Sequence, residues 1–155
     1  MKNFFIALAS VSLFSCNQND RSAADTTKVQ SEIKSTIDSY NNDIRKEGLR
    51  GQLKYLDSSK NFFWVPPGYL NYANYDTIVS AIGRHASSLK SIDNRYDSLL
   101  IIPLTDEYAQ FVMRTISNSV TAGGDTIRSA FIESGVMVKR KEGWKFLSGQ
   151  TSLLD

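Results

Sequence analysis

Apolar residues recur at helical spacing in the first third of the chain. The longest run predicts an amphipathic helix, and its apolar stripe consists of Val29, Ile33, Ile37, Tyr40 and Ile44. Thr27 and Gln30 form a capping-box pattern, which predicts the start of this helix at Thr27. Gly48 supplies the stop signal that ends it.

Three shorter elements follow before the middle of the chain. Leu49, Leu53 and Leu56 predict a short second helix. The compact apolar run 62–65 predicts a strand that Pro66-Pro67-Gly68 cuts off. Asn74 can cap a third helix, whose inward stripe is then Ile78, Ile82, His85 and Leu89.

The second half of the chain has the residue composition of β-strands. Stretches rich in Ile, Val, Phe and Thr predict four strands at 96–104, 108–121, 126–140 and 144–152. Turn signals separate them: Pro103 with Asp106, then residues 123–125 and 141–143. Helices that precede hairpin-connected strands predict an α+β fold, with the helices packed on one face of an antiparallel sheet.

The N-terminus has the features of a targeting signal. Lys2 is followed by a mostly apolar run at 4–14, which is too short to cross a bilayer as a helix. The closing Leu13-Phe14-Ser15-Cys16 resembles the lipobox of bacterial lipoproteins, in which the cysteine is lipidated and becomes the new N-terminus. We therefore expect a lipid on Cys16 that anchors the protein to a membrane of the bacterial cell envelope, on the periplasmic side or the outer surface. The alternative is that Cys16 is a free thiol at the start of a secreted protein.

A polar segment separates this signal from the main body of the chain. Residues 16–27 contain no large apolar side chain and predict a flexible tether. The expected organisation is a signal peptide at 1–15, a tether at 16–27 and one α+β domain at 28–155. Asp25-Thr26-Thr27 in the tether is similar to the short O-glycosylation sites of Bacteroidetes-type exported proteins.

Composition narrows the classes of function. The chain has 155 residues and a formal charge of +2 that is spread along its length, which argues against nucleic-acid binding. One cysteine excludes an intrachain disulfide, and one histidine excludes a multi-histidine metal centre. We expect neither a metal nor a cofactor.

The order of elements resembles the nuclear-transport-factor-2-like superfamily, in its SnoaL-like branch. The similarity covers residues 28–152, and its sharpest local motif is Gly143-Trp144-Lys145-Phe146, with Trp64-Val65-Pro66-Pro67-Gly68 as the first strand and turn. The resemblance implies a cone-shaped curved sheet closed by helices, with a pocket inside. It also implies a homodimer through the outer sheet face. Enzymes of this superfamily pair a pocket carboxylate with a His, a Tyr or a second acid.

His85 is the first candidate for chemistry because it is the single imidazole and lies on the inward stripe of the third helix. A neutral imidazole there could act as a general base near neutral pH. The alternative is a core histidine that makes one hydrogen bond and has no role in catalysis.

Alternation along the strands supplies four polar candidates. If Phe131 faces the interior, Glu133 faces it too, and Arg114 on the preceding strand is then expected to meet Glu133 as a buried pair or an anion clamp. A solvated salt bridge between them on the outer face is the alternative. Ser148 and Gln150 fall toward the cone if Trp144 belongs to the core.

Aromatic residues gather around the Pro-Pro-Gly turn. The cluster consists of Trp64, Tyr69, Tyr72 and Tyr75, at the expected mouth of the cone. It could stack on a ligand, contact a protein, or form a packed lid over the core.

Two functions follow from these features. The favoured one is a lipid-anchored, non-catalytic module that binds a small apolar or amphipathic ligand or a protein partner. The alternative is a small isomerase, dehydratase or hydrolase-like enzyme with His85 as general base and Arg114 or Gln150 stabilising negative charge.

Overall fold

The computed structural model describes residues 23–154, which form the expected α+β fold. The elements in chain order are α1 (Ala23–Glu47), the 3₁₀ helix η1 (Leu49–Tyr55), β1 (Phe63–Val65), α2 (Tyr75–Ser87), β2 (Leu89–Pro103), β3 (Tyr108–Thr121), β4 (Thr126–Arg140) and β5 (Gly143–Leu154). One five-stranded sheet has the order β1-β5-β4-β3-β2. Neighbouring strands are antiparallel except for β1 and β5, which run parallel.

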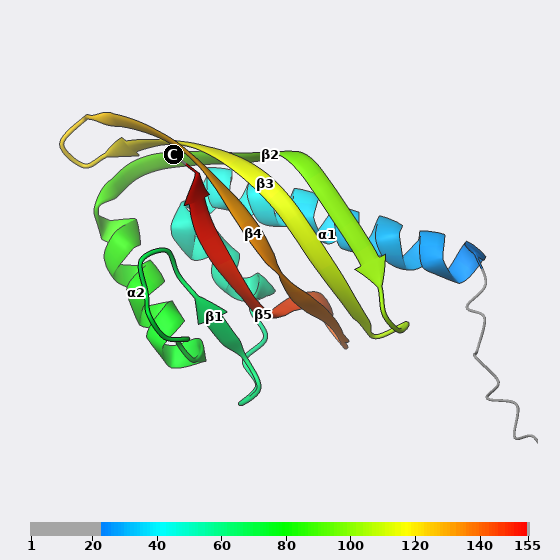
Figure 1. The fold of residues 1–155 in the computed structure, drawn as a ribbon. Helices are drawn as coiled ribbons and strands as arrows, with labels where there is room; N and C mark the ends of the chain where they lie inside the picture. Colours follow the sequence, from blue (N-terminus) through cyan, green and yellow to red (C-terminus); the bar gives the residue numbers. More distant parts are fainter. Residues whose placement is uncertain (1–22, 155) are drawn as a thin grey trace, which may run out of the picture.

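Figure 1 shows the long strands bending across α1, which lies along one face of the sheet. The start of α1 and the helix α2 lie at opposite ends of the molecule. The sheet is curved and does not close into a barrel, so the concave face, α1, η1 and α2 enclose the interior between them. The cone-shaped fold expected from the sequence is thereby confirmed.

The apolar stripe of α1 forms the core, as its spacing predicts. All five of its members are buried, and they pack against inward residues of the sheet such as Phe111, Met113 and Phe146. A smaller cluster of Phe62, Ala73 and Ile78 lies where α2 meets β1.

α1 begins earlier than the capping-box pattern predicts. It starts at Ala23, so Thr27 lies inside the helix, and residues 23–27 of the predicted tether are helical. Alanine has the highest helix propensity, and an acidic residue in the first turn, such as Asp25, stabilises the helix by interacting favourably with the helix dipole. Gln30 does not cap the helix, because its Nε2 donates to the carbonyl oxygen of Ile101 at 3.1 Å. The signal peptide, Cys16 and the rest of the tether lie outside the described residues.

The end of α2 and the start of β2 differ from the positions that the sequence predicts. Asn74 caps α2 as predicted, because its side-chain oxygen accepts from the backbone N–H of Thr77 at 3.0 Å. The helix ends at Ser87, and Leu89 already belongs to β2, which starts seven residues before the predicted Tyr96. Most residues between Leu89 and Tyr96 are polar, so the hydrophobicity pattern did not predict a strand there.

None of the helices formed by residues 23–154 combines the length and the apolar character needed to cross a membrane.

Candidate functional site

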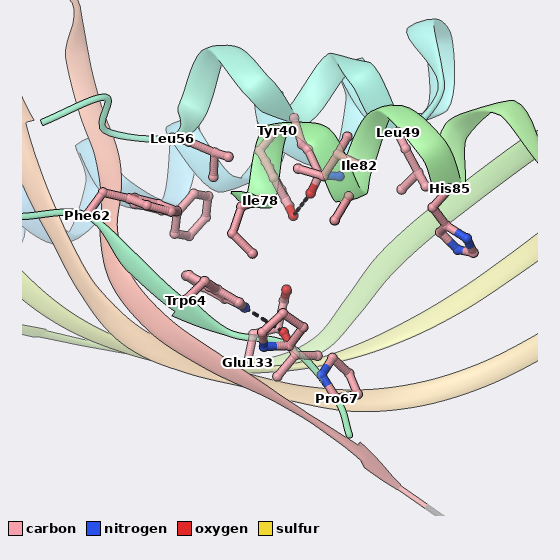
Figure 2. Close-up of a pocket in the computed structure, with 15 residues that line it drawn as sticks. Tyr40, Leu49, Leu56, Phe62, Trp64, Pro67, Ile78, Ile82, His85 and Glu133 are labelled. Atoms are coloured by element: carbon pink, nitrogen blue, oxygen red, sulfur yellow. Dashed lines mark hydrogen bonds between the residues drawn. The ribbon is translucent and has the colours of Figure 1, made fainter. Parts of the chain in front are cut away.

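A pocket of about 230 Å³ opens between the concave face of the sheet and the helices η1 and α2. Its walls come from all three helices and from β1, β4 and β5. The lining residues are Tyr40, Leu49, Gln52, Leu56, Phe62, Trp64, Pro66, Pro67, Ile78, Ala81, Ile82, His85, Glu133, Phe146 and Thr151. Most of them are aromatic or aliphatic, and Figure 2 shows them converging on a common space.

Glu133 is the buried ionisable group on the sheet side of this pocket. It shares the inward face of β4 with Phe131, as the alternation predicts, and it lies opposite Met113 of β3 and Thr151 of β5. The residue is 9% exposed. Burial raises the pKa of Glu133 to about 7, and a hydrogen bond from the Thr151 side chain opposes part of that rise. The carboxyl group can therefore exchange a proton near neutral pH.

Tyr40 brings a second polar group to the pocket, from α1. Its hydroxyl donates to Oε1 of Gln52 on η1 at 3.2 Å. Gly51 allows this pairing, because a side chain there would place its Cβ 2.5 Å from the carbonyl oxygen of Asp43 and push η1 away from α1. Burial, and then the charge of Glu133, raise the pKa of Tyr40 well above its usual value. Tyr40 and Glu133 point into the pocket from opposite walls (Figure 2).

Trp64 forms a wall of the pocket next to Glu133. Its Nε1 donates to Oγ1 of Thr151 at 2.9 Å, which fixes the indole over β5. Gly149 makes room for the ring, since a Cβ at that position would lie 2.7 Å from two of its atoms. Trp64 also meets Phe146 edge-on, with ring centroids 6.1 Å apart. The predicted ligand-facing position of Trp64 therefore agrees with the pocket geometry.

Ser148 and Gln150 point away from the pocket, contrary to the prediction. The register of β4 and β5 shifts at a β-bulge, so Met137 pairs with Phe146 while Val136 pairs with Ser148. Trp144 and Phe146 face inward before the bulge, but beyond it the inward residues are Gly149 and Thr151. A bulge inserts one extra residue and reverses the alternation that the prediction assumed.

Arg114 does not meet Glu133, so the predicted pair is wrong. The register places Met113 opposite Glu133 and Arg114 opposite Ile132, which puts Arg114 on the outer face of the sheet. There its guanidinium forms an exposed ion pair with Asp97. Alternation predicts which residues of one strand share a face, but it does not predict which of these sets lies on the same side of the sheet as a set from the neighbouring strand.

His85 lies at the rim of the pocket and is exposed. Of the inward stripe predicted for the third helix, Ile78 and Ile82 line the pocket and His85 reaches its rim, whereas Leu89 belongs to β2. The ring Nδ1 of His85 lies 3.5 Å from Oγ of Ser88. Figure 2 places the imidazole apart from the Glu133 carboxyl, so these two groups are not assembled as a catalytic pair.

The three tyrosines of the predicted aromatic mouth do not line the pocket. Tyr75 packs edge-on against Phe62, and Tyr72 packs against Phe63. Tyr69 and Tyr72 are 51% and 72% exposed. The chain turns after Val65, so the pocket edge is formed by Trp64, Pro66 and Pro67, while the loop beyond them faces solvent.

The sequence-based prediction missed three polar residues of the site: Tyr40, Gln52 and Thr151. Tyr40 looked like one more member of the α1 core stripe, and Gln52 had no pattern that marked it. Thr151 becomes a pocket residue only because of the bulge in β5. Among residues 23–154, no group of three or more His, Cys, Asp or Glu side chains could hold a metal ion.

No family model and no curated protein matches the chain, but many solved structures share its fold. A nuclear-transport-factor-2-like superfamily protein from Salmonella enterica superposes with a TM-score of 0.70 at 17% identity, covering 83% of this chain and 93% of that one. A proposed dehydratase of the same fold family from Streptomyces avermitilis gives 0.69 at 12% identity, covering 83% and 97%. A ketosteroid isomerase-like protein from Erwinia carotovora gives 0.63 at 13% identity, covering 81% and 95%. The chain thus has the nuclear-transport-factor-2-like fold, as its order of elements indicated.

Proposed function

We propose that this domain binds a small, predominantly apolar molecule in the pocket, with Glu133 as the main polar contact. The observation that carries the proposal is a carboxyl group buried among aromatic and aliphatic side chains, with no lysine or arginine among the described residues that line the pocket. Such a group costs folding free energy, and carboxyl groups of this kind concentrate at functional sites. An apolar pocket with few convergent polar groups is the usual form of a ligand site.

The dimensions of the pocket favour a small ligand. Its volume of about 230 Å³ lies below the range of about 300–1,000 Å³ that is typical of sites for drug-sized molecules. A molecule with one or two rings fits this space. The proposal keeps the ligand-binding function favoured by the sequence and assigns it to Glu133, Trp64, Tyr40 and Thr151.

The lipid anchor on Cys16 belongs to the same proposal. α1 has 25 residues and spans about 37 Å, and its start lies at the far end of the molecule from α2 (Figure 1). A tether that enters at Ala23 leaves the pocket free of the membrane-bound end. The domain would then capture ligand on the cell-envelope side to which the lipid attaches it. The homodimer expected through the outer sheet face stays a prediction.

A second function, proton-transfer catalysis, is favoured by the ionisation of Glu133. A carboxyl with a pKa of about 7 can act as both general base and general acid near neutral pH. The Tyr40 hydroxyl on the opposite wall donates to Gln52, so it could stabilise charge that develops on a substrate only by exchanging that hydrogen bond for one to the substrate. This candidate keeps the isomerase or dehydratase chemistry that the sequence left open, with Glu133 in place of the exposed His85 as the base. Solved structures of this fold include proteins named as dehydratase and isomerase-like, which supports the candidate at the level of fold.

One probe tests both functions. 5-Nitrobenzisoxazole is small, apolar and neutral, and loss of its C3 proton to a base breaks the N–O bond and releases a coloured cyanophenolate. We expect saturable binding, measured by quenching of tryptophan fluorescence, and release of phenolate faster than in buffer. Ile82→Trp should abolish binding by filling the pocket, whereas Ile102→Trp on the outer face should leave binding intact.

The variants separate the two functions. If Glu133 is the base, Glu133→Gln should reduce the catalysed rate at least 100-fold, consistent with the usual contribution of a general base of about 10²–10⁴-fold. His85→Gln should keep most of the rate. Binding without any catalysed rate would leave the binding function and remove the catalytic one. Absence of saturable binding, or binding that survives Ile82→Trp, would contradict the pocket as the site.

A further inference from the structure

At the Glu133 end of the pocket, the polar groups can accept a hydrogen bond from a ligand more readily than they can donate one. The Tyr40 hydroxyl already donates to Gln52. The Thr151 hydroxyl accepts from Trp64 and hydrogen-bonds the Glu133 carboxyl, which uses its proton when that carboxyl is ionised. The carboxylate oxygens of Glu133 retain free lone pairs, because an ionised carboxylate has about four acceptor sites. The open position at Glu133 therefore suits a hydrogen-bond donor.

The charge of Glu133 is also uncompensated within the pocket. Of the described residues that line it, none is a lysine or an arginine. Two arginines on neighbouring parts of the sheet are committed elsewhere, because Arg114 pairs with Asp97 and Arg140 pairs with Asp57. A buried carboxylate without a counter-charge is costly, so a cation brought by the ligand would offset that cost.

The walls around Glu133 suit the organic part of a cation. Tyr40 and Trp64 each meet Phe146 edge-on, with centroids 5.0 and 6.1 Å from that ring. Aromatic faces attract ammonium groups, and this attraction strengthens when the cation is desolvated. An anionic ligand would meet the same aromatic faces and the Glu133 carboxylate unfavourably.

We infer that the ligand of this pocket is a small organic amine whose protonated nitrogen binds Glu133 while its apolar part lies among Tyr40, Trp64 and Phe146. The inference rests on the proposed ligand-binding function and names the chemical class of the ligand. It does not require turnover, because an amine paired with the carboxylate keeps Glu133 ionised.

The test compares two probes of equal size, benzylamine and benzyl alcohol. At pH 8, where Glu133 is mostly ionised, we expect isothermal titration calorimetry to give benzylamine at least tenfold higher affinity than benzyl alcohol. Glu133→Gln should abolish this preference. Glu142→Gln, in the exposed turn between β4 and β5, removes a carboxylate of the same type and should keep it.

The pH dependence supplies a second readout. The other titratable groups that line the pocket are Tyr40 from α1 and His85 from α2. The permanent cation benzyltrimethylammonium removes ligand titration, and the His85→Gln variant removes the imidazole. In that variant the affinity should fall about tenfold between pH 8 and pH 6 as Glu133 takes up its proton.

The outcomes distinguish the inference from the function on which it rests. Equal affinity for benzylamine and benzyl alcohol would overturn the amine inference and leave ligand binding in place. An amine preference that survives Glu133→Gln would also overturn it, because the cation would then bind elsewhere. If neither probe binds the wild-type pocket, the proposed ligand-binding function fails with it.

Discussion

At the scale of single residues, Glu133 couples the pocket to the stability of the fold. The pKa of its carboxyl is about 7 in the folded protein, against an ordinary value of 4.5. A pKa that is higher in the folded than in the unfolded chain means that the protonated form favours folding. The stabilisation is complete below about pH 4.5 and is lost as the pH rises through about 7.

Replacing Glu133 by Gln should therefore stabilise the protein at alkaline pH. Glutamine cannot ionise, so the variant escapes a loss that amounts to about 3 kcal/mol at about 1.4 kcal/mol per pKa unit. Urea unfolding at pH 8.5 should show the variant to be more stable by roughly 2–3 kcal/mol, with a much smaller difference at pH 4.5. Glu142→Gln is the exposed control and should show no such change with pH. A difference between wild type and Glu133→Gln that is the same at both pH values would contradict the assigned pKa.

The sequence predicted some of these side-chain positions and not others. The inward position of Glu133 followed from its alternation with Phe131, because residues two apart on a strand share a face. The error at Arg114 came from the register between strands, which depends on long-range pairing. Tyr40 could be assigned to the interior from its helical spacing, but not to the pocket, since that depends on where η1 packs.

At the scale of elements, the β-bulge in β5 determines which side chains form the site. It turns Gly149 and Thr151 inward and moves Ser148 and Gln150 to the outer face. The parallel strand β1 then pairs with this part of β5, which brings Trp64 opposite Gly149. The Trp64 wall of the pocket thus depends on the bulge and on the missing side chain at position 149.

The close contact at Gly149 can be tested by adding one methyl group. In Gly149→Ala the new Cβ would lie 2.6 Å from the Ser134 carbonyl oxygen and 2.7 Å from the Trp64 ring. We expect a loss of about 1–3 kcal/mol in the free energy of unfolding and a shift in tryptophan emission.

A second glycine provides the matched control. Gly83 lies inside α2, and a Cβ added there meets nothing within 4 Å. Gly83→Ala should raise stability by about 0.5–1 kcal/mol through helix propensity. Both changes are measured by urea unfolding. A Gly149→Ala variant as stable as wild type would show that Trp64 does not approach β5 as described.

At the scale of the whole molecule, the start of α1 lies at the opposite end of the domain from α2, which lines the pocket (Figure 1). α1 starts at Ala23 and runs along the sheet, and its residue that lines the pocket is Tyr40. This arrangement is compatible with the proposed tether at one end and the proposed ligand site at the other.

The proposed lipid anchor can be tested in the intact chain. Cys16→Ser removes the sulfur to which the lipid would attach, so the variant produced in a bacterial host should lose palmitate labelling and leave the membrane fraction. Asn19→Ser, three residues away, should behave as wild type. A Cys16→Ser variant that stays in the membrane fraction would contradict lipid anchoring.

The sequence by itself determined the element order, the α+β class, the core stripe of α1 and the cap of α2. These features depend on local periodicity and on short-range hydrogen bonds, which the residue types specify directly. The order of elements also sufficed to indicate the nuclear-transport-factor-2-like fold.

Only the tertiary structure decided the composition of the site. Glu133 gains its raised pKa from burial, in a pocket whose other walls include α1, β1 and α2, which are distant in the sequence. Thr151 faces the pocket and Ser148 faces away from it because β5 has one extra residue where it pairs with β4. Register, bulges and desolvation arise from contacts between elements, so no pattern within a single element contains them.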